Sequence, residues 1–258
     1  MWKPLEINTS SINKESIELL FSDETPAVII RNFYGKKYCK TVVNRIKEQK
    51  FENFQNQKLN HIGPFLMSFI TKKNQYFDEA KLADKTFNRI FYELPLPSER
   101  LYKTMSKVYP QNSISVASES QNRFSPFVIR IHDKGKLIPI HRDNVGYEGK
   151  EYGISNIDKQ LSCVLHLQES ELGGNLIIYR RQWTKKDEKF RKIDFGYSSD
   201  LISSSEFYKI SNLESGDLVL INPNYYHEVT TIEGETPRVT LGMFLGFYEI
   251  ENKIVAWV

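Results

Sequence analysis

The chain has 258 residues, of which 40 % are hydrophobic and 26 % charged, so it is long enough to bury a sizeable core. Its net charge of +3, from 35 basic and 32 acidic residues, comes without a long Lys/Arg run and argues against nucleic acid as a partner. Two distant cysteines exclude a disulfide framework, and no apolar run approaches the roughly 18 residues of a membrane helix. The N-terminus also lacks the apolar core of a signal peptide, so we expect a soluble, cytoplasmic protein without a membrane partner.

The first 125 residues carry apolar side chains mainly at helical spacing. Tyr38, Val42 and Ile46 recur every fourth residue and predict one core-facing helix. The short β-branched run Ala27-Val28-Ile29-Ile30 predicts a strand before it. A second apolar stripe predicts another helix and consists of Phe77, Ala80, Phe87, Ile90, Phe91 and Leu94.

Short strands separated by turns are predicted after residue 125. Residues 127–132 and 137–141 flank Asp133-Lys134-Gly135-Lys136, which is a typical hairpin pattern. Gly173-Gly174, Ser215-Gly216 and other turn residues punctuate the rest. Further strands are predicted at 161–167, 175–180, 217–221, 228–232, 238–248 and 253–258.

This order of elements predicts an α+β fold that is mainly β, namely a double-stranded β-helix (jelly roll) with N-terminal supporting helices. We expect one domain over residues 1–258, in which 1–125 form a mainly helical support region and 126–258 the jelly-roll core. Residues 182–214 are long for a connector, and such stretches are usually lids or surface insertions. Within them, Lys185-Lys186-Asp187-Glu188-Lys189 mixes charges and is interpreted as a solvated loop.

A candidate metal site begins at His141, the one histidine of five in a His-x-acidic arrangement, His141-Arg142-Asp143. At the end of a strand, residues i and i+2 project to the same face, so this imidazole and this carboxylate can converge on one ion. His132 and Asp133 are adjacent in sequence and would point to opposite faces while the strand continues. The pair His141 and Asp143 is therefore the candidate.

Downstream residues complete this site. His227 is placed at the start of a strand, from which a third ligand can arrive, and Arg238 and Thr240 follow on one face of the next strand. An arginine with a hydroxyl at i+2 suits the far carboxylate of 2-oxoglutarate. Two imidazoles and one carboxylate leave three positions of an octahedron open, enough for a chelating cosubstrate and dioxygen, and this donor set suits Fe(II).

Several segments resemble a known superfamily. They are Ile129-Arg130-Ile131, Gly135, His141-Arg142-Asp143, Gly173-Gly174-Asn175-Leu176, Ser215-Gly216-Asp217, Tyr226-His227-Glu228-Val229-Thr230 and Pro237-Arg238-Val239-Thr240-Leu241-Gly242. With them the chain resembles the Fe(II)/2-oxoglutarate-dependent oxygenases. It is most similar to the freestanding halogenases of hapalindole-type alkaloids and to the N-succinyl-amino-acid hydroxylases. The resemblance is strong after residue 125 and loose before it.

The resemblance implies that His141, Asp143 and His227 hold Fe(II), with 2-oxoglutarate and dioxygen as cosubstrates. In the halogenases a small residue replaces the acidic ligand and chloride takes its position, whereas this chain has Asp143. We therefore expect a hydroxylase for an unactivated C–H bond of a small molecule, either an amino acid or an amino-acid-derived natural product. The alternatives are a halogenase, a desaturating or ring-forming oxygenase, a protein or peptide hydroxylase, and a non-catalytic jelly-roll binding module. A monomer and a homodimer are both compatible with the sequence.

The residues predicted to contact the substrate are few. Arg130 shares a face with His141 if Lys134-Gly135 is a two-residue hairpin loop, and it would then bind a carboxylate of the substrate or the cosubstrate. Asn144 and Gly146, just beyond the ligands, are expected at the mouth of the pocket. The resemblance adds Ile138, because the related halogenases place a substrate-contacting apolar residue near that point. Residues 61–66 are a candidate pocket wall, and structural roles are favoured for His132 and His166.

Overall fold

The computed structural model describes residues 2–48, 60–193 and 196–258. Its α-helices are α1 Lys14–Phe21, α2 Lys36–Glu48, α3 Lys73–Ile90, α4 Pro97–Val108 and α5 Val145–Glu148, and its 3-10 helices are η1 Leu66–Phe69, η2 Gly153–Asn156, η3 Lys185–Phe190 and η4 Ser199–Leu201. Its strands are β1 Leu5–Asn8, β2 Val28–Arg31, β3 Asn60–Ile62, β4 Ser113–Val116, β5 Ser118–Glu119, β6 Asn122–Arg123, β7 Val128–His132, β8 Ile138–His141, β9 Lys159–Gln168, β10 Leu176–Gln182, β11 Arg191–Ile193, β12 Gly196–Tyr197, β13 Phe207–Ile210, β14 Leu218–Ile221, β15 Tyr225–Val229, β16 Arg238–Tyr248 and β17 Lys253–Trp257. The predicted α+β character, with most of the regular structure in sheets, is confirmed.

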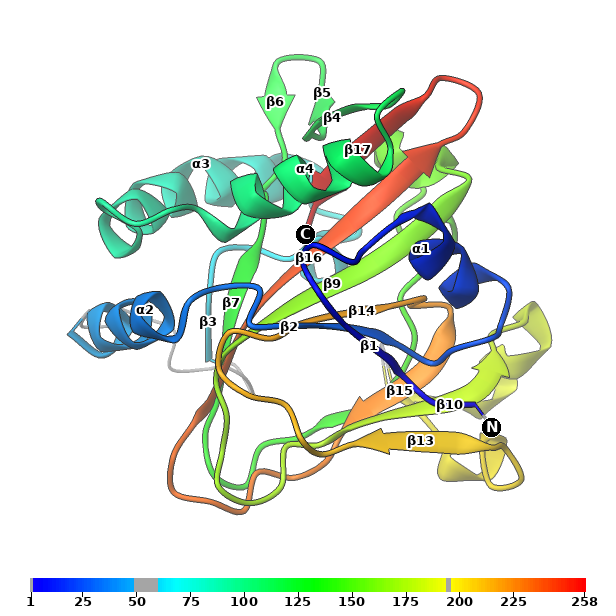
Figure 1. The fold of residues 1–258 in the computed structure, drawn as a ribbon. Helices are drawn as coiled ribbons and strands as arrows, with labels where there is room; N and C mark the ends of the chain where they lie inside the picture. The colour runs from blue at the N-terminus through cyan, green and yellow to red at the C-terminus, as the bar shows by residue number, and fades with distance from the viewer. Residues whose placement is uncertain (1, 49–59, 194–195) are drawn as a thin grey trace.

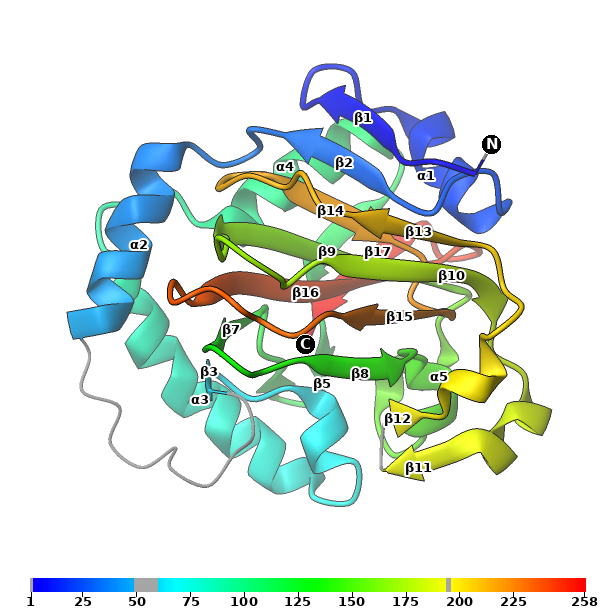
Figure 2. The same ribbon diagram turned by 90° about the horizontal axis from the view of Figure 1, so that it is seen from below.

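Two facing sheets form the body of the molecule. The larger has the order β1-β2-β14-β9-β16-β17-β4, and β7 also pairs with β16 and carries β3 at its other edge. The smaller has the order β13-β10-β15-β8. Figure 2 shows the smaller sheet in front of the larger one, the arrangement expected of a jelly roll.

The larger sheet separates α1, α2, α3 and α4 from the smaller sheet (Figure 1). On β14, Leu218 and Leu220 share an apolar cluster with residues of α1, α2, α3 and α4. Val219 and Ile221 point the other way and pack with Leu176 and other residues of the smaller sheet. This alternation is the period of two of a strand buried on both faces. The space between the two sheets is where the candidate site lies.

The predicted hairpin around Gly135 is wrong. β7 pairs with β16 and β3, whereas β8 pairs with β15 in the other sheet. Gly135 does make a turn, with φ +80°, but its N–H donates to the carbonyl of Ile232 at 2.8 Å, and Ile232 N–H donates to that of Lys136 at 2.8 Å. The turn is thus bound to a distant loop and carries the chain from one sheet to the other.

Two smaller expectations also need correction. Tyr38 is 41 % exposed, and the buried face of α2 is formed by Cys39, Val42, Val43 and Ile46. Residues 185–189 lie in η3 and not in a loop; their three lysines are exposed as expected, but Asp187 is 3 % exposed within a capping box. The stretch 182–214 is also more than an insertion, since it contains β13, an edge strand of the smaller sheet.

The border predicted at residue 125 separates the two regions only in part. The four long helices do precede residue 109, but β1, β2, β3 and β4 from the same region are strands of the larger sheet. The first region therefore supplies sheet as well as support. Among the described residues, no helix is long and apolar enough to cross a membrane.

Candidate metal centre

His141 and His227 come from neighbouring strands of the smaller sheet. His141 ends β8, His227 lies in the middle of β15, and the two are directly opposite each other in the register. Opposite residues of an antiparallel pair project to the same face, and the two ring centroids are 4.1 Å apart. Asp143 follows in the turn after β8, where its N–H donates to the carbonyl of Pro223 at 2.9 Å. The strand predicted at 228–232 in fact spans Tyr225–Val229, so His227 does not precede it.

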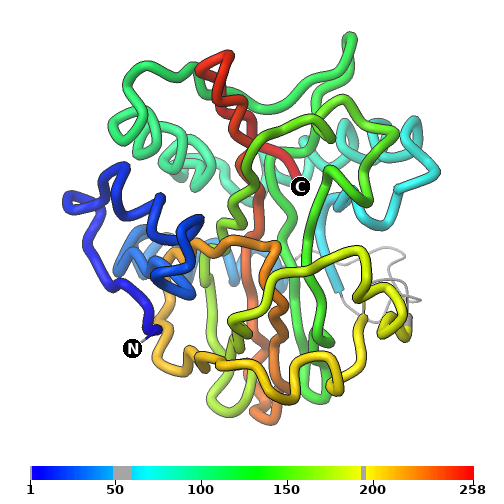
Figure 3. The backbone as a smooth tube through the Cα atoms, turned by 90° about the vertical axis from the view of Figure 1, so that its right-hand side faces the viewer, coloured from blue at the N-terminus to red at the C-terminus, as the bar shows by residue number. Residues whose placement is uncertain are grey.

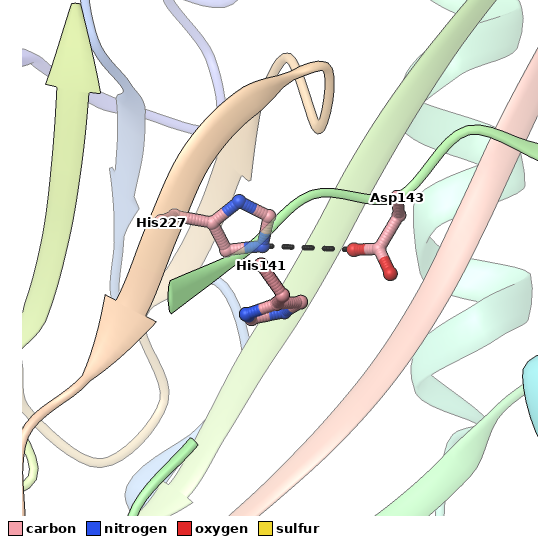
Figure 4. A group of neighbouring side chains, drawn as sticks. All are labelled: His141, Asp143 and His227. Carbon is pink, nitrogen blue, oxygen red and sulfur yellow. Dashed lines mark ion pairs between the residues drawn. The ribbon is translucent and has the colours of Figure 1, made fainter. Parts of the chain in front are cut away.

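The three side chains converge on one point (Figure 4). One ring nitrogen of each histidine and one carboxylate oxygen of Asp143 all lie within 4.8 Å of one another, and His227 Nε2 is 3.5 Å from Asp143 Oδ2. Nδ1 of His141 and of His227 each lies 2.8 Å from a backbone carbonyl, that of Pro139 and of Tyr225 respectively. A carbonyl oxygen only accepts, so each Nδ1 carries the hydrogen and each Nε2 keeps a free lone pair. Two such nitrogens with one carboxylate fit a divalent ion of the Fe(II) type.

Burial and neighbouring charges set the protonation of this cluster. Burial, together with His227, lowers the pKa of His141 to about 4, so its ring is neutral at pH 7. Burial raises the pKa of Asp143, but the neighbouring imidazoles of His227, at 3.5 Å, and His141 and the charge of Arg130 outweigh it and lower the value to about 2. His141 and Asp143 are therefore already in the protonation states that metal binding requires.

The cluster faces a cavity of about 180 Å³ between the sheets. The inner face of the larger sheet supplies one wall, and η1 supplies another through Leu66 and Met67. The C-terminal Val258 also lines the cavity, and in Figure 3 the C-terminus lies inside the outline of the molecule. One part of the cavity is polar and the rest is mainly aliphatic, so a ligand there meets both kinds of surface.

Arg238 and Thr240 lie at the polar part of this cavity, as predicted from their i, i+2 spacing on β16. They are 3 % and 1 % exposed, respectively. Arg238 Nε is 3.8 Å from a carboxylate oxygen of Glu169, and burial lowers the pKa of Arg238. A buried guanidinium beside a hydroxyl can bind a carboxylate through charge-assisted hydrogen bonds.

His166 is in the cavity too, although the sequence favours a structural role for it. It is directly opposite Thr240 across β9 and β16, and its Nδ1 is 2.6 Å from Glu169 Oε1. Its Nε2 is buried without a hydrogen-bond partner in the described part of the chain. His132, by contrast, does not line the cavity, and burial lowers its pKa well below the ordinary value. The alternation of β9, with Val164 and His166 on one face, is the signal that could have identified His166.

The structure brings most of the predicted substrate residues to the cavity. Arg130, Ile138 and Asn144 line it, as do His61, Phe65 and Leu66 of the predicted wall. Arg130 reaches it by a route other than the predicted hairpin, because its strand pairs with β16 and places it opposite Thr240. Gly146 does not line the cavity and is exposed, since α5 begins after Asn144 and turns the chain outward.

Comparison with known proteins confirms the family resemblance seen in the sequence. Residues 1–258 match the family model described as "Carrier-protein-independent halogenase WelO5". "Leucinostatins biosynthesis cluster protein S" of Purpureocillium lilacinum is 30 % identical over 226 residues, which cover 84 % of each chain. "L-gamma-glutamyl-L-propargylglycine hydroxylase" of Streptantibioticus cattleyicolor is 20 % identical over 260 residues, covering 97 % of this chain and 95 % of the relative.

Solved structures share the fold. An N-substituted L-amino acid dioxygenase from Burkholderia ambifaria AMMD superposes with a TM-score of 0.62 at 12 % identity, covering 95 % of this chain and 91 % of the other. HygX from Streptomyces hygroscopicus, solved with nickel and 2-oxoglutarate bound, gives a TM-score of 0.52 at 14 % identity, with 93 % and 89 % coverage. At these identities the likeness concerns the fold alone.

Proposed function

The chain belongs to the carrier-protein-independent halogenase WelO5 family and is a 2-oxoglutarate-dependent non-haem iron dioxygenase, and we propose that it hydroxylates an unactivated C–H bond of an amino acid or an amino-acid-derived small molecule. The single observation that carries this proposal is the convergence of His141, His227 and the carboxylate of Asp143 at the edge of a cavity between the two sheets. Fe(II), 2-oxoglutarate and dioxygen are the cofactor and cosubstrates of this class.

His141, Asp143 and His227 hold the metal in this proposal. The backbone carbonyls of Pro139 and Tyr225 orient the two imidazoles and fix the tautomer that presents Nε2. When bound, the iron with its cosubstrate supplies the oxidising chemistry that removes hydrogen from carbon. The task of the protein is to hold these ligands in place, exclude water and aim one C–H bond at the metal.

Arg238 and Thr240 bind the far carboxylate of 2-oxoglutarate. Both face the cavity from the beginning of β16, in the sheet opposite the strands that carry His141 and His227. The Glu169 carboxylate contacts both His166 and Arg238 and orients their side chains. A buried guanidinium held in this way pairs with a carboxylate in a fixed direction.

Asp143 favours hydroxylation over halogenation. A halide needs a coordination position next to the metal, and a carboxylate at residue 143 fills one of the positions that the protein controls. The pKa of Asp143, lowered to about 2, keeps this group anionic and able to coordinate at neutral pH. Halogenation remains the second candidate because the family model carries that description.

The names of two similar proteins suggest the substrate class. One hydroxylates a γ-glutamyl amino acid, and the other is a dioxygenase of N-substituted L-amino acids. The cavity, mainly aliphatic beyond its polar part, is compatible with a substrate that has an apolar carbon chain and a few polar groups.

Substrate-dependent formation of succinate tests the proposal. Purified protein with Fe(II), 2-oxoglutarate and air should release succinate when supplied with a suitable free, N-acylated or γ-glutamyl L-amino acid. The product should gain the mass of one oxygen atom. As a check on the site, His141→Ala and His227→Ala should lose Fe(II) binding while keeping the circular dichroism of the parent. Wild-type binding of iron by either variant would remove that residue from the metal site.

A further inference from the structure

Four polar side chains form a row across the inner face of the larger sheet. His61 on β3 is opposite Arg130 on β7, Arg130 is opposite Thr240 on β16, and Thr240 is opposite His166 on β9. All four line the cavity. The row therefore places Arg130 beside Thr240, on the side away from His166.

The two arginines of the cavity have different surroundings. Arg238 has Glu169 at 3.8 Å, whereas the guanidinium of Arg130 makes no hydrogen bond or ion pair with any residue that the structure describes. Burial lowers the pKa of Arg130, the Asp143 carboxylate opposes this, and Arg238 adds to it. The carboxylate whose charge acts on Arg130 is thus that of Asp143, which is a proposed metal ligand. Arg130 is left as a cation without a partner of its own.

The position of Arg130 is built into the sheet. A Cβ at Gly242, two residues beyond Thr240, would lie 2.3 Å from Nη1 of Arg130, so only glycine leaves room for the guanidinium there. On its other side the guanidinium lies over the ring of Phe65, 5.7 Å from the centroid. Phe65 begins the apolar wall that continues with Leu66 and Met67. The cation is therefore fixed between the cosubstrate residues and an apolar surface.

Arg130 is half-buried where it faces the cavity, and a cation there without an anionic partner is unfavourable, so ligands commonly supply the missing charge. We propose that Arg130 binds a carboxylate of the substrate, so that the enzyme acts on carboxylic acids whose carbon chain lies against Phe65, Leu66 and Met67. This inference rests on the function proposed above. It deepens it by assigning the cosubstrate's far carboxylate to Arg238 and the substrate's carboxylate to Arg130.

Binding measurements without turnover can test this assignment. Protein loaded with Mn(II) and 2-oxoglutarate is titrated calorimetrically with free, N-acetyl and γ-glutamyl L-amino acids, each beside its carboxamide. At least one acid should bind about 30-fold or more tightly than its carboxamide, and Arg130→Gln should remove that preference. Arg130→Lys should restore part of it, and Arg123→Gln, at an exposed position, should change nothing.

A second variant and a second ligand keep the test decisive. Gly242→Ala leaves the charge in the chain but displaces the guanidinium, so it should weaken acid binding as Arg130→Gln does. Both variants should still bind 2-oxoglutarate like the parent, which also shows that they fold. Weaker 2-oxoglutarate binding by Arg130→Gln would assign Arg130 to the cosubstrate, and equal binding of all acids and carboxamides would also overturn the proposal. Failure of the proposed function would look different, since no compound would then yield succinate with the unaltered protein.

Discussion

At the scale of single residues, the carboxylate of Asp143 is the proposed third protein ligand of the metal and supplies the negative charge of this cluster. Its backbone is held by the Pro223 carbonyl, and its side chain lies 3.5 Å from His227 Nε2. The charge of the carboxylate offsets part of the charge of a divalent ion, which chloride could also do if space were available. The choice between an oxygenated and a halogenated product therefore depends on this side chain.

Asp143→Gly should lose most of its hydroxylation, because one ligand and one negative charge are removed from the site. The unaltered enzyme should give oxygenated product alone, even in saturating chloride. Mass spectrometry of products from both proteins, with and without chloride, measures this. Chlorinated product from the unaltered enzyme would contradict the proposed hydroxylase. Undiminished hydroxylation by Asp143→Gly would show that Asp143 is not a required ligand.

Arg238 is the proposed anchor for the other end of the cosubstrate. Truncating one partner of a buried charge pair commonly costs about 2–5 kcal/mol, so Arg238→Ala should raise the apparent constant for 2-oxoglutarate by about 30-fold or more. Iron binding should persist, since Arg238 does not belong to the His141, Asp143 and His227 cluster. Steady-state kinetics and an iron titration of the same preparation measure the two effects. An unchanged 2-oxoglutarate constant would place the anchor elsewhere.

Residue spacing predicted much of this site, but for different reasons at different positions. His141 with Asp143, and Arg238 with Thr240, are i, i+2 pairs, so their common face follows from strand geometry alone. Arg130 also faces the cavity, yet the strand predicted to pair with its own, residues 137–141, is in the other sheet, and its actual partner is Thr240. Pairing between strands more than 100 residues apart carries no local signal, so the right position came from an incorrect pairing.

At the scale of elements, the positions of the strands in the sequence were predicted better than their pairing in the sheets. The strand 238–248 was predicted with its observed bounds, whereas the 127–141 segment was predicted as a hairpin and proved to cross between sheets. The turn residues of a hairpin and of such a crossing are the same, because both need a residue with positive φ such as Gly135. What distinguishes them is the contact of Gly135 with Ile232, which the local sequence does not encode.

Several side chains join the segment that follows β10 to α5, and among them Arg142 is buried. Its guanidinium lies 4.2 Å from the ring centroid of Trp183 and 5.0 Å from that of Tyr147. It pairs with Glu148 at 2.9 Å and lies 3.6 Å from Glu188. The residue between the two proposed ligands His141 and Asp143 thus anchors Trp183 and η3 to α5.

Arg142→Met should loosen this attachment, because the apolar contact remains while Glu148 and Glu188 each lose one of two cations, the other being Arg191. Trypsin should then cleave faster between residues 183 and 192, and turnover should fall while iron still binds. Limited proteolysis followed by mass spectrometry locates the cleavage, with Arg123→Met as the matched control at an exposed position. Cleavage at the parental rate would show that Arg142 does not hold the segment.

At the scale of the whole molecule, the protein has three layers, and the cavity lies between the two sheets. Helices cover one face of the larger sheet, and the smaller sheet covers the other and brings the histidines. The layers follow from composition and periodicity, so the sequence predicted them. The polar part of the cavity does not follow from composition and periodicity. It requires Arg130, Thr240 and His166, on three different strands, to be aligned in register. Burial of His141 at the edge of this cavity makes the stability of the metal-free protein depend on pH.

Metal-free protein should lose stability as the pH falls from 6.5 toward 4. Burial lowers the pKa of His141 to about 4 in the folded protein, whereas its ordinary value in the unfolded chain is about 6.5. Between these pH values His141 is protonated in the unfolded chain and neutral in the folded protein. The free energy of unfolding should therefore decrease with falling pH in that window, and His141 should account for about 2 kcal/mol between pH 7 and pH 5. Urea denaturation in the presence of a chelator measures this difference. In His141→Gln, which has no proton to bind at that position, the difference should be smaller by that amount, and an equal difference in both proteins would mean that His141 is protonated in the folded state.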